Sequence, residues 1–220
     1  MSGRVVLVVA DDLGYDPAID VGILEAHVRG VVTATSAMVD GALARSALAA
    51  APSTLAVGLH LSIRSGAGEE EAGREIGRQL RLFEAIRGRP PSHVDGHRHV
   101  HAEPPVLAAL LRIAGPLRLR VRALDPAMRD RVRAAGARAC DHFLGDAGLR
   151  PCWTPERLLA TVEGLAPGST EIMIHPGLRP THVRTTFGVE REVELAAATD
   201  PRVLEALRAP GVELRAVLGE

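Results

Sequence analysis

Apolar residues occur along this chain in short runs, which charged and turn-forming residues separate. The clearest run, Val5 to Ala10, is continuous and rich in β-branched residues, and two aspartates end it. A continuous run of this length is typical of a strand buried on both faces, as in a parallel sheet. Further strands are predicted at residues 31–38, 55–61, 93–95, 117–121, 137–141, 171–174 and 212–217.

Between these runs, apolar residues recur at the spacing of a helix. Pro17 can open the first helix, and Ile19, Ile23 and Leu24 follow at helical spacing until Gly30 ends it. Further helices are predicted at residues 42–51, 69–87, 105–114, 126–135, 155–165 and 189–207. The regular alternation favours an α/β fold: a TIM-barrel-like (β/α) barrel, with distortion allowed, of seven or eight parallel strands. No linker divides the chain, so we expect residues 1–220 to form a single domain.

Composition narrows the classes of function. Lys is absent, which excludes Schiff-base chemistry on lysine and the phosphate-binding lysine of a Walker motif. Net charge is -1 and aromatic content is 2%, so nucleic acid is not an expected partner. The longest apolar run near the N-terminus is far shorter than the roughly 20 residues that span a bilayer. Asp11 and Asp12 stand where a signal-peptide cleavage site would lie, so we expect no membrane partner and a cytoplasmic location.

The candidate catalytic and metal-binding residues lie where predicted strands end, because functional groups of a parallel barrel gather at the carboxyl ends of its strands. Asp11 and Asp12 follow the first strand, where one carboxylate can bind a metal and the other can act as a base. A simple turn with Gly14 explains the pair about as well. His60 lies in an apolar strand, where a core histidine is the commoner interpretation.

Four of the nine histidines lie within positions 93–101. On an extended backbone His97, His99 and His101 would share one side, and three imidazoles in one region favour a metal site over a plain turn. Asp95 or His99 could orient a ligand rather than bind the ion. His175 follows another apolar strand and could protonate a leaving amine, although a structural strand-end histidine fits equally.

In combination, these segments resemble the YdjC-like carbohydrate deacetylases, the family that includes chitooligosaccharide deacetylase. The resemblance rests on blocks that occur in the family's order and cover most of the chain. They are Val-Ala-Asp-Asp-Leu-Gly, Gly-Ile-Leu-Glu-Ala-His, Gly-Val-Val-Thr-Ala-Thr-Ser-Ala-Met-Val, Val-Gly-Leu-His-Leu, His-Val-Asp-Gly-His-Arg-His-Val-His and Ile-His-Pro-Gly, with a weaker match at 141–145. Val9 and Leu13 depart from the usual Asn and Phe, and the stretch between His60 and His93 is short for the family.

The resemblance implies a TIM-barrel-like fold and hydrolysis of the N-acetyl group of an amino sugar or N-acetylated oligosaccharide, with release of acetate. It also implies that Asp12, His60 and His97 bind one divalent metal ion, magnesium or zinc, that Asp11 is the base, and that His175 acts near the leaving group. A metal-dependent hydrolase of another amide or a phosphoester, and a non-catalytic sugar-binding member, are the alternative hypotheses. Assembly as a homodimer is left open.

Overall fold

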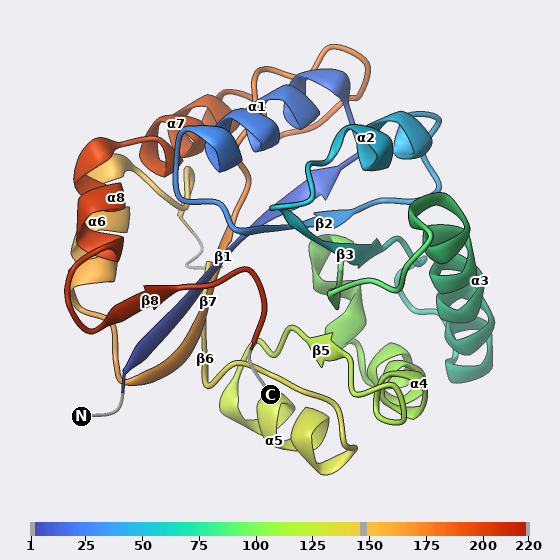
Figure 1. Cartoon of the computed structure of the whole chain (residues 1–220). Helices are drawn as coiled ribbons and strands as arrows, with labels where there is room; N and C mark the ends of the chain where they lie inside the picture. Colours follow the sequence, from blue (N-terminus) through green and yellow to red (C-terminus); the bar gives the residue numbers. More distant parts are fainter. Residues whose placement is uncertain (1–2, 146–148, 219–220) are drawn as a thin grey trace.

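Eight parallel strands form one curled sheet in the computed structural model, which describes residues 3–145 and 149–218 (Figure 1). The strands are β1 (Arg4–Leu13), β2 (Ala34–Ala37), β3 (Ala56–Leu61), β4 (His93–Gly96), β5 (Arg120–Val121), β6 (His142–Leu144), β7 (Gly168–Ile174) and β8 (Val212–Leu214). Their order is β5-β4-β3-β2-β1-β7-β6, and β8 pairs with β1.

The long first strand is the centre of the sheet. One edge of β1 pairs with β7 from Arg4 to Ala10. The opposite edge pairs with β8 near its start and with β2 from Val9 onward. Between the outer strands β5 and β6, the described residues form one isolated bridge, Arg120 to Arg138. The result is a distorted (β/α) barrel, which confirms the fold class predicted from the sequence.

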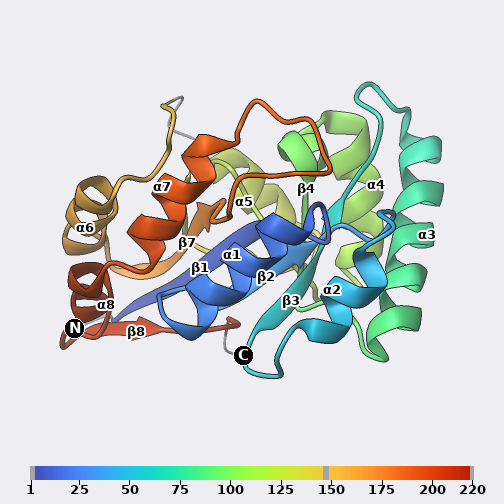
Figure 2. The same cartoon turned by 90° about the horizontal axis from the view of Figure 1, so that it is seen from above.

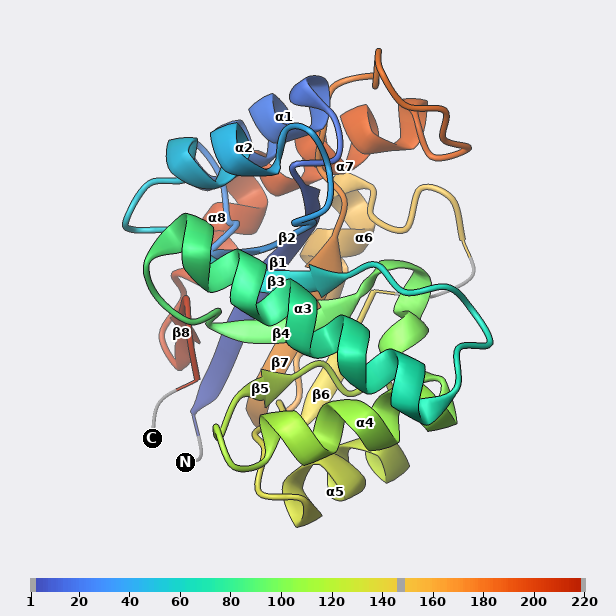
Figure 3. The same cartoon turned by 90° about the vertical axis from the view of Figure 1, so that its right-hand side faces the viewer.

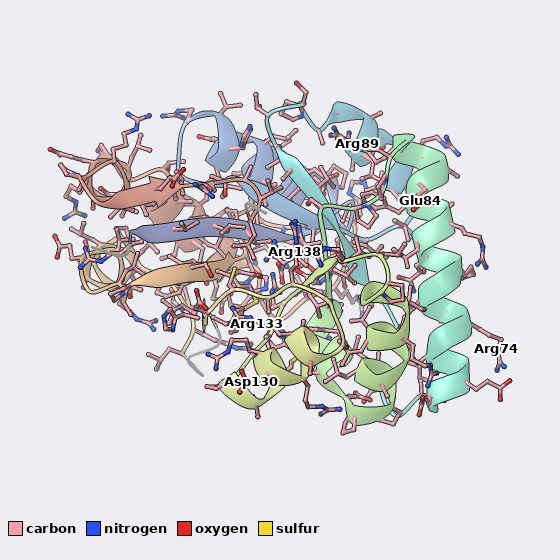
Figure 4. The ribbon with its side chains drawn as sticks, turned by 60° about the horizontal axis from the view of Figure 1, so that its bottom comes forward. Arg74, Glu84, Arg89, Asp130, Arg133 and Arg138 are labelled. Carbon is pink, nitrogen blue, oxygen red and sulfur yellow. The ribbon has the colours of Figure 1, made fainter. Side chains whose placement is uncertain are left out.

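Helices cover the outside of this sheet (Figures 2 and 3). They are α1 (Pro17–Val28), α2 (Ala44–Ala50), α3 (Glu69–Arg87), α4 (Pro104–Ala114), α5 (Pro126–Ala134), α6 (Pro155–Glu163), α7 (Val189–Ala198) and α8 (Pro201–Leu207), with a 3-10 helix η1 (His97–Ala102) after β4. Figure 4 shows Arg74 on the side of α3 that faces away from the sheet. The apolar sides of the helices therefore pack on the strands and their charges face outward.

The two faces of the sheet bury different kinds of side chain. Val6, Val8 and Ala10 of β1 belong to the large apolar core shared with the helices. Leu7 and Val9, which alternate with them, belong to a small cluster with Ala34 and Cys140. Because successive strand residues point to opposite faces, this small cluster fills only part of the barrel interior. Buried charged residues occupy the rest, as the next subsection describes.

Three element predictions need correction. The prediction of a strand at 137–141 is wrong, because only Arg138 makes a bridge there and β6 begins at His142. The single helix predicted at 189–207 is two helices, because Asp200 and Pro201 start a new one and the Asp200 carboxylate accepts a hydrogen bond from the Arg202 N–H. The first strand is longer than predicted and includes both aspartates.

Within the described part of the chain, no helix is both long and apolar enough to cross a membrane.

A close backbone approach fixes α1 against the segment that follows β7. A Cβ atom at Gly22 would lie 2.4 Å from the Cα of Gly177, whereas a Cβ at Gly73 of α3 would have Ala109 as its nearest contact at 3.9 Å. We expect Gly22→Ala to lower the free energy of unfolding by about 1–3 kcal/mol, because backbone must move. Gly73→Ala should raise it by about 0.5–1 kcal/mol, because alanine favours the helix. Urea denaturation of both variants measures the difference, and equal effects would contradict the close approach.

Candidate active site

The carboxyl end of β1 brings two aspartates to one cavity. The backbone of Asp12 has φ of 77°, and the pairing of β1 with β2 is irregular between Ala10 and Leu13. A regular strand would point neighbouring side chains to opposite faces, and this local distortion breaks that alternation. Asp11 and Asp12 consequently both line a cavity of about 530 Å³ at the carboxyl ends of the strands.

Asp12, His60 and His97 meet at this cavity. The Asp12 Oδ1 atom lies 3.3 Å from His60 Nε2 and 3.1 Å from His97 Nδ1. One ligand atom from each of the three residues fits within 4.8 Å of the others. Asp12 and His60 are buried, while the His97 side chain is 27% exposed. A carboxylate and two imidazoles that face an open cavity fit a divalent ion with free positions for water and substrate.

Other side chains orient His60. Its Nδ1 atom donates to Asp95 Oδ1 at 2.7 Å and lies 3.2 Å from Ser36 Oγ. A hydrogen bond from one ring nitrogen to a carboxylate fixes the tautomer and leaves the other nitrogen free to bind a metal. Asp95 therefore orients the imidazole, one of the roles that the sequence left open for it.

Arg122 connects three buried carboxylates. Its guanidinium binds Asp11 through two hydrogen bonds of 2.7 Å, and it also contacts Asp95 Oδ2 at 2.7 Å and Glu171 Oε1 at 2.6 Å. Arg120 pairs with the same glutamate. Burial alone would raise the pKa of Asp11, but the charge of Arg122 outweighs it and holds that pKa well below its usual range. Asp11 is therefore ionised at neutral pH.

The same contacts distinguish the two oxygens of Asp11. Oδ1 accepts hydrogen bonds from Arg122 and from Ser36, which occupies both of its lone pairs. Oδ2 accepts only from Arg122 among the described residues, and it lies 4.0 Å from His175 Nε2. A proton acceptor with a free lone pair thus faces His175 across the cavity.

Helix α7 supports both sides of the site. Glu194 Oε2 accepts from the backbone N–H of His175 at 2.7 Å and lies 3.8 Å from its Nδ1 atom. Burial would lower the pKa of His175, but Glu194 and Asp11 outweigh it and raise that pKa. Three residues earlier, Arg191 Nη2 binds Asp12 Oδ2 at 2.5 Å. Asp12 is left with Oδ1, the oxygen that faces both histidines, for a metal ion.

A second set of potential ligands, Asp11, His60 and Asp95, also lies within 4.8 Å. Arg122 already binds both of these carboxylates, so this set does not suit a cation. The set with Asp12 and His97 is the better candidate.

The histidine-rich segment does not fold as expected. Positive φ angles at Arg98 and His99 and a 3-10 helix replace the extended backbone that would have aligned the three histidines. Only His97 reaches Asp12 and His60. His99 lies edge-on to His101, 5.9 Å between ring centres, and His101 is fully buried. The prediction of one shared side was wrong, because the turn after β4 rotates each side chain differently.

Sequence reasoning missed Arg122, Glu171, Arg191 and Glu194. Arg120 lies in the predicted strand 117–121 and Arg122 directly follows it, and Glu171 begins the apolar run that ends at Ile174. Charges at such positions are costly unless they are paired, so they could have indicated an ion pair inside the barrel. Arg191 and Glu194 lie in a charged helix whose sequence gives no comparable signal.

Comparison with known proteins identifies the family. The family model described as "YdjC-like protein" matches residues 5–70 and 64–209 of the chain. The chain belongs to the YdjC-like family. The resemblance predicted from the sequence is thereby confirmed.

Relatives in this family carry deacetylase names. A carbohydrate deacetylase from Geobacillus stearothermophilus is 31% identical over 241 residues, which covers 96% of each chain. A chitooligosaccharide deacetylase from Serratia marcescens is 31% identical and covers 94% of this chain and 96% of the relative.

Solved structures share the fold. An Enterococcus faecalis protein with a suggested role in cellobiose-phosphate cleavage has a TM-score of 0.86 at 26% identity, with 97% of each chain covered. A family 4 carbohydrate esterase from Streptomyces lividans, solved with acetate, has a TM-score of 0.61 at 12% identity and covers 96% of this chain and 92% of its own. At that identity the second likeness concerns the fold alone.

The buried pairing of Arg122 should dominate stability. We expect Arg122→Met to lower the free energy of unfolding by about 3–5 kcal/mol, because three buried carboxylates lose their common partner. Arg112→Met is the matched control: Arg112 pairs with Glu69 on the surface, where an ion pair contributes less than about 1 kcal/mol. Chemical denaturation of both variants measures the two losses. Similar small losses would contradict the central role of Arg122.

Proposed function

We propose that this YdjC-like protein is a metal-dependent carbohydrate deacetylase, which hydrolyses the N-acetyl group of an amino sugar or N-acetylated oligosaccharide and releases acetate. One observation carries the proposal. The ligand set Asp12, His60 and His97 faces a cavity where a proton acceptor, Asp11 Oδ2, and a proton donor, His175 Nε2, lie 4.0 Å apart. The names of the relatives supply the substrate class.

Asp12, His60 and His97 are the residues that would hold the ion. A divalent ion there, zinc or magnesium, would supply Lewis-acid activation of water and of the acetyl carbonyl group. Two imidazoles favour zinc, because neutral imidazole suits it better than it suits magnesium. Asp95 and Arg191 then act on the ligands: Asp95 orients His60, and Arg191 holds Asp12 Oδ2.

Asp11 has the position and the charge of a general base. The attacking water must lose a proton as it adds to the acetyl carbon, and Oδ2 has the free lone pair to accept it. Arg122 and Ser36 hold the carboxylate in one orientation, so little reorganisation accompanies the transfer.

His175 has the position of a general acid. The departing amine must gain a proton before the carbon–nitrogen bond breaks. Glu194 and Asp11 raise the pKa of His175, so a larger fraction of the imidazole is protonated at neutral pH. Glu194 also holds the backbone of His175, whose Nε2 atom lies 4.0 Å from Asp11 Oδ2.

Removing the base should separate chemistry from metal binding. We expect Asp11→Asn to lower kcat by about 10²–10⁴, because the amide cannot accept the proton, while the bound metal stays near one ion per chain. Acetate release from N-acetylated chitooligosaccharides and elemental analysis measure the two quantities. Asp130→Asn, at an exposed position on α5, is the control for a lost carboxylate. Wild-type turnover in Asp11→Asn would refute the assignment.

Metal removal tests the ligand set. We expect a chelator to abolish acetate release and either zinc or magnesium to restore it, because the protein's own side chains supply no equivalent Lewis acid. His60→Ala should lower both bound metal and turnover at least about tenfold, since it removes a ligand. The exposed His142→Ala should change neither. Full activity in His60→Ala, together with protein that purifies without a stoichiometric ion, would rule out metal dependence.

A further inference from the structure

The loop between β7 and α7, residues 175–188, forms one wall of the active-site cavity. Thr185, Thr186 and Phe187 line the cavity. The Phe187 ring lies 5.3 Å from the ring of His175. The backbone carbonyl of Phe187 accepts a hydrogen bond from Arg191 Nε at 3.1 Å. The position of this loop therefore decides the shape of the cavity next to His175.

The loop needs anchors outside itself. It has no regular secondary structure between β7 and α7, and backbone groups in such a segment must find partners elsewhere. At its start, the Leu178 N–H donates to the carbonyl of Ala18 at 3.0 Å, and Gly177 packs directly on α1. Figures 1 and 2 show the loop leaving β7, passing beside the start of α1 and continuing into α7.

Asp16 provides the anchor at the middle of the loop. Its side chain is fully buried, and its Oδ2 atom accepts hydrogen bonds from three consecutive backbone N–H groups. These belong to Thr181 at 3.1 Å, His182 at 2.7 Å and Val183 at 3.2 Å. Successive N–H groups that converge on one oxygen form an anion-binding concavity, and bonds to a charged acceptor are the stronger kind. One carboxylate therefore holds the loop.

The same carboxylate also caps α1. Oδ1 of Asp16 accepts from the Ala18 N–H at 2.9 Å, and Pro17 follows at the first helical position. An N-cap needs only this one contact, and serine serves as well as aspartate. The second oxygen, and the negative charge, are thus available for the loop rather than required by the helix.

We propose that Asp16 is a positioning residue for the reaction: it fixes the β7–α7 loop against α1, so that Phe187 and its neighbours form the substrate-binding wall beside His175. The kinetic part of this inference rests on the proposed deacetylase function. The structural part rests only on the contacts of Asp16.

The test compares two helix caps with the same Asp-Pro sequence. Asp125 caps α5 through a bond of 2.8 Å to the Met128 N–H, followed by Pro126, and α5 lies away from the β7–α7 loop. Asp16→Ser and Asp125→Ser both keep a capping oxygen. Only Asp16→Ser removes the oxygen that holds residues 181–183.

We expect Asp16→Ser to raise KM for an N-acetylated chitooligosaccharide by at least about fivefold with kcat within about threefold, because a binding wall is loosened while the reacting groups remain. Trypsin should cleave the loop after Arg184 at least about tenfold faster, because cleavage follows local opening. Asp125→Ser should keep the wild-type KM and loop cleavage rate. Wild-type values in Asp16→Ser, or equal changes in both variants, would overturn the proposal.

Asp16→Asn guards against a folding defect in the serine variant. Asparagine keeps the shape of the side chain but replaces one of the two oxygens with an NH2 group, which cannot accept a hydrogen bond. Either the loop N–H groups or the cap N–H of Ala18 therefore loses its acceptor. Faster tryptic cleavage of the loop in Asp16→Asn, with an unchanged circular dichroism spectrum, supports the proposal, and a wild-type cleavage rate opposes it. If the wild-type protein releases no acetate from any substrate, the proposed function fails, whereas the cleavage comparison still decides the role of Asp16.

Discussion

The structure depends most on the ion pairs of the Arg122 guanidinium. The guanidinium lies inside the barrel, has no exposure to solvent, and binds Asp11, Asp95 and Glu171 from three different strands. Removing four charges from water is costly, and only their close mutual pairing offsets that cost. Since Asp11 and Asp95 belong to the candidate site, the pairing that makes a charged barrel interior possible also holds the proposed base and the partner of His60 in place. Stability and site geometry therefore depend on the same contact.

Around this centre, the site is assembled from both ends of the chain. The strands β1, β3 and β4 supply Asp12, His60 and the approach to His97, and β7 supplies His175. Helix α7, which lies outside the barrel, reaches in with Arg191 and Glu194, one toward a metal-ligand candidate and the other toward the acid candidate. A helix that contacts both groups links their positions, so the packing of α7 on the barrel belongs to the site as much as the strand ends do.

The family members named as deacetylases share about a third of their residues with this chain, and the carbohydrate esterase of similar fold shares far fewer. What the present structure adds is the surroundings of the motif residues. The stretch between His60 and His93 is occupied mainly by α3, which packs on the outside of the sheet. The described cavity wall is instead built from the η1 segment, the residues around Cys152 and the β7–α7 loop.

The sequence by itself determined the alternation of strands and helices, the barrel class and most element boundaries, because burial on both faces of a parallel strand and helical periodicity are local patterns. It also singled out Asp11, Asp12, His60, His97 and His175, since each follows or ends an apolar run. Only the tertiary structure decided that His99 and His101 lie apart from His97, because the dihedral angles of a short turn set their directions. Likewise, only the folded chain brings Arg122, Arg191 and Glu194 to the site and Asp16 to a loop 165 residues away. Partners so distant in sequence leave no periodic signal, and the pairing of buried charges depends on which strand ends meet in space.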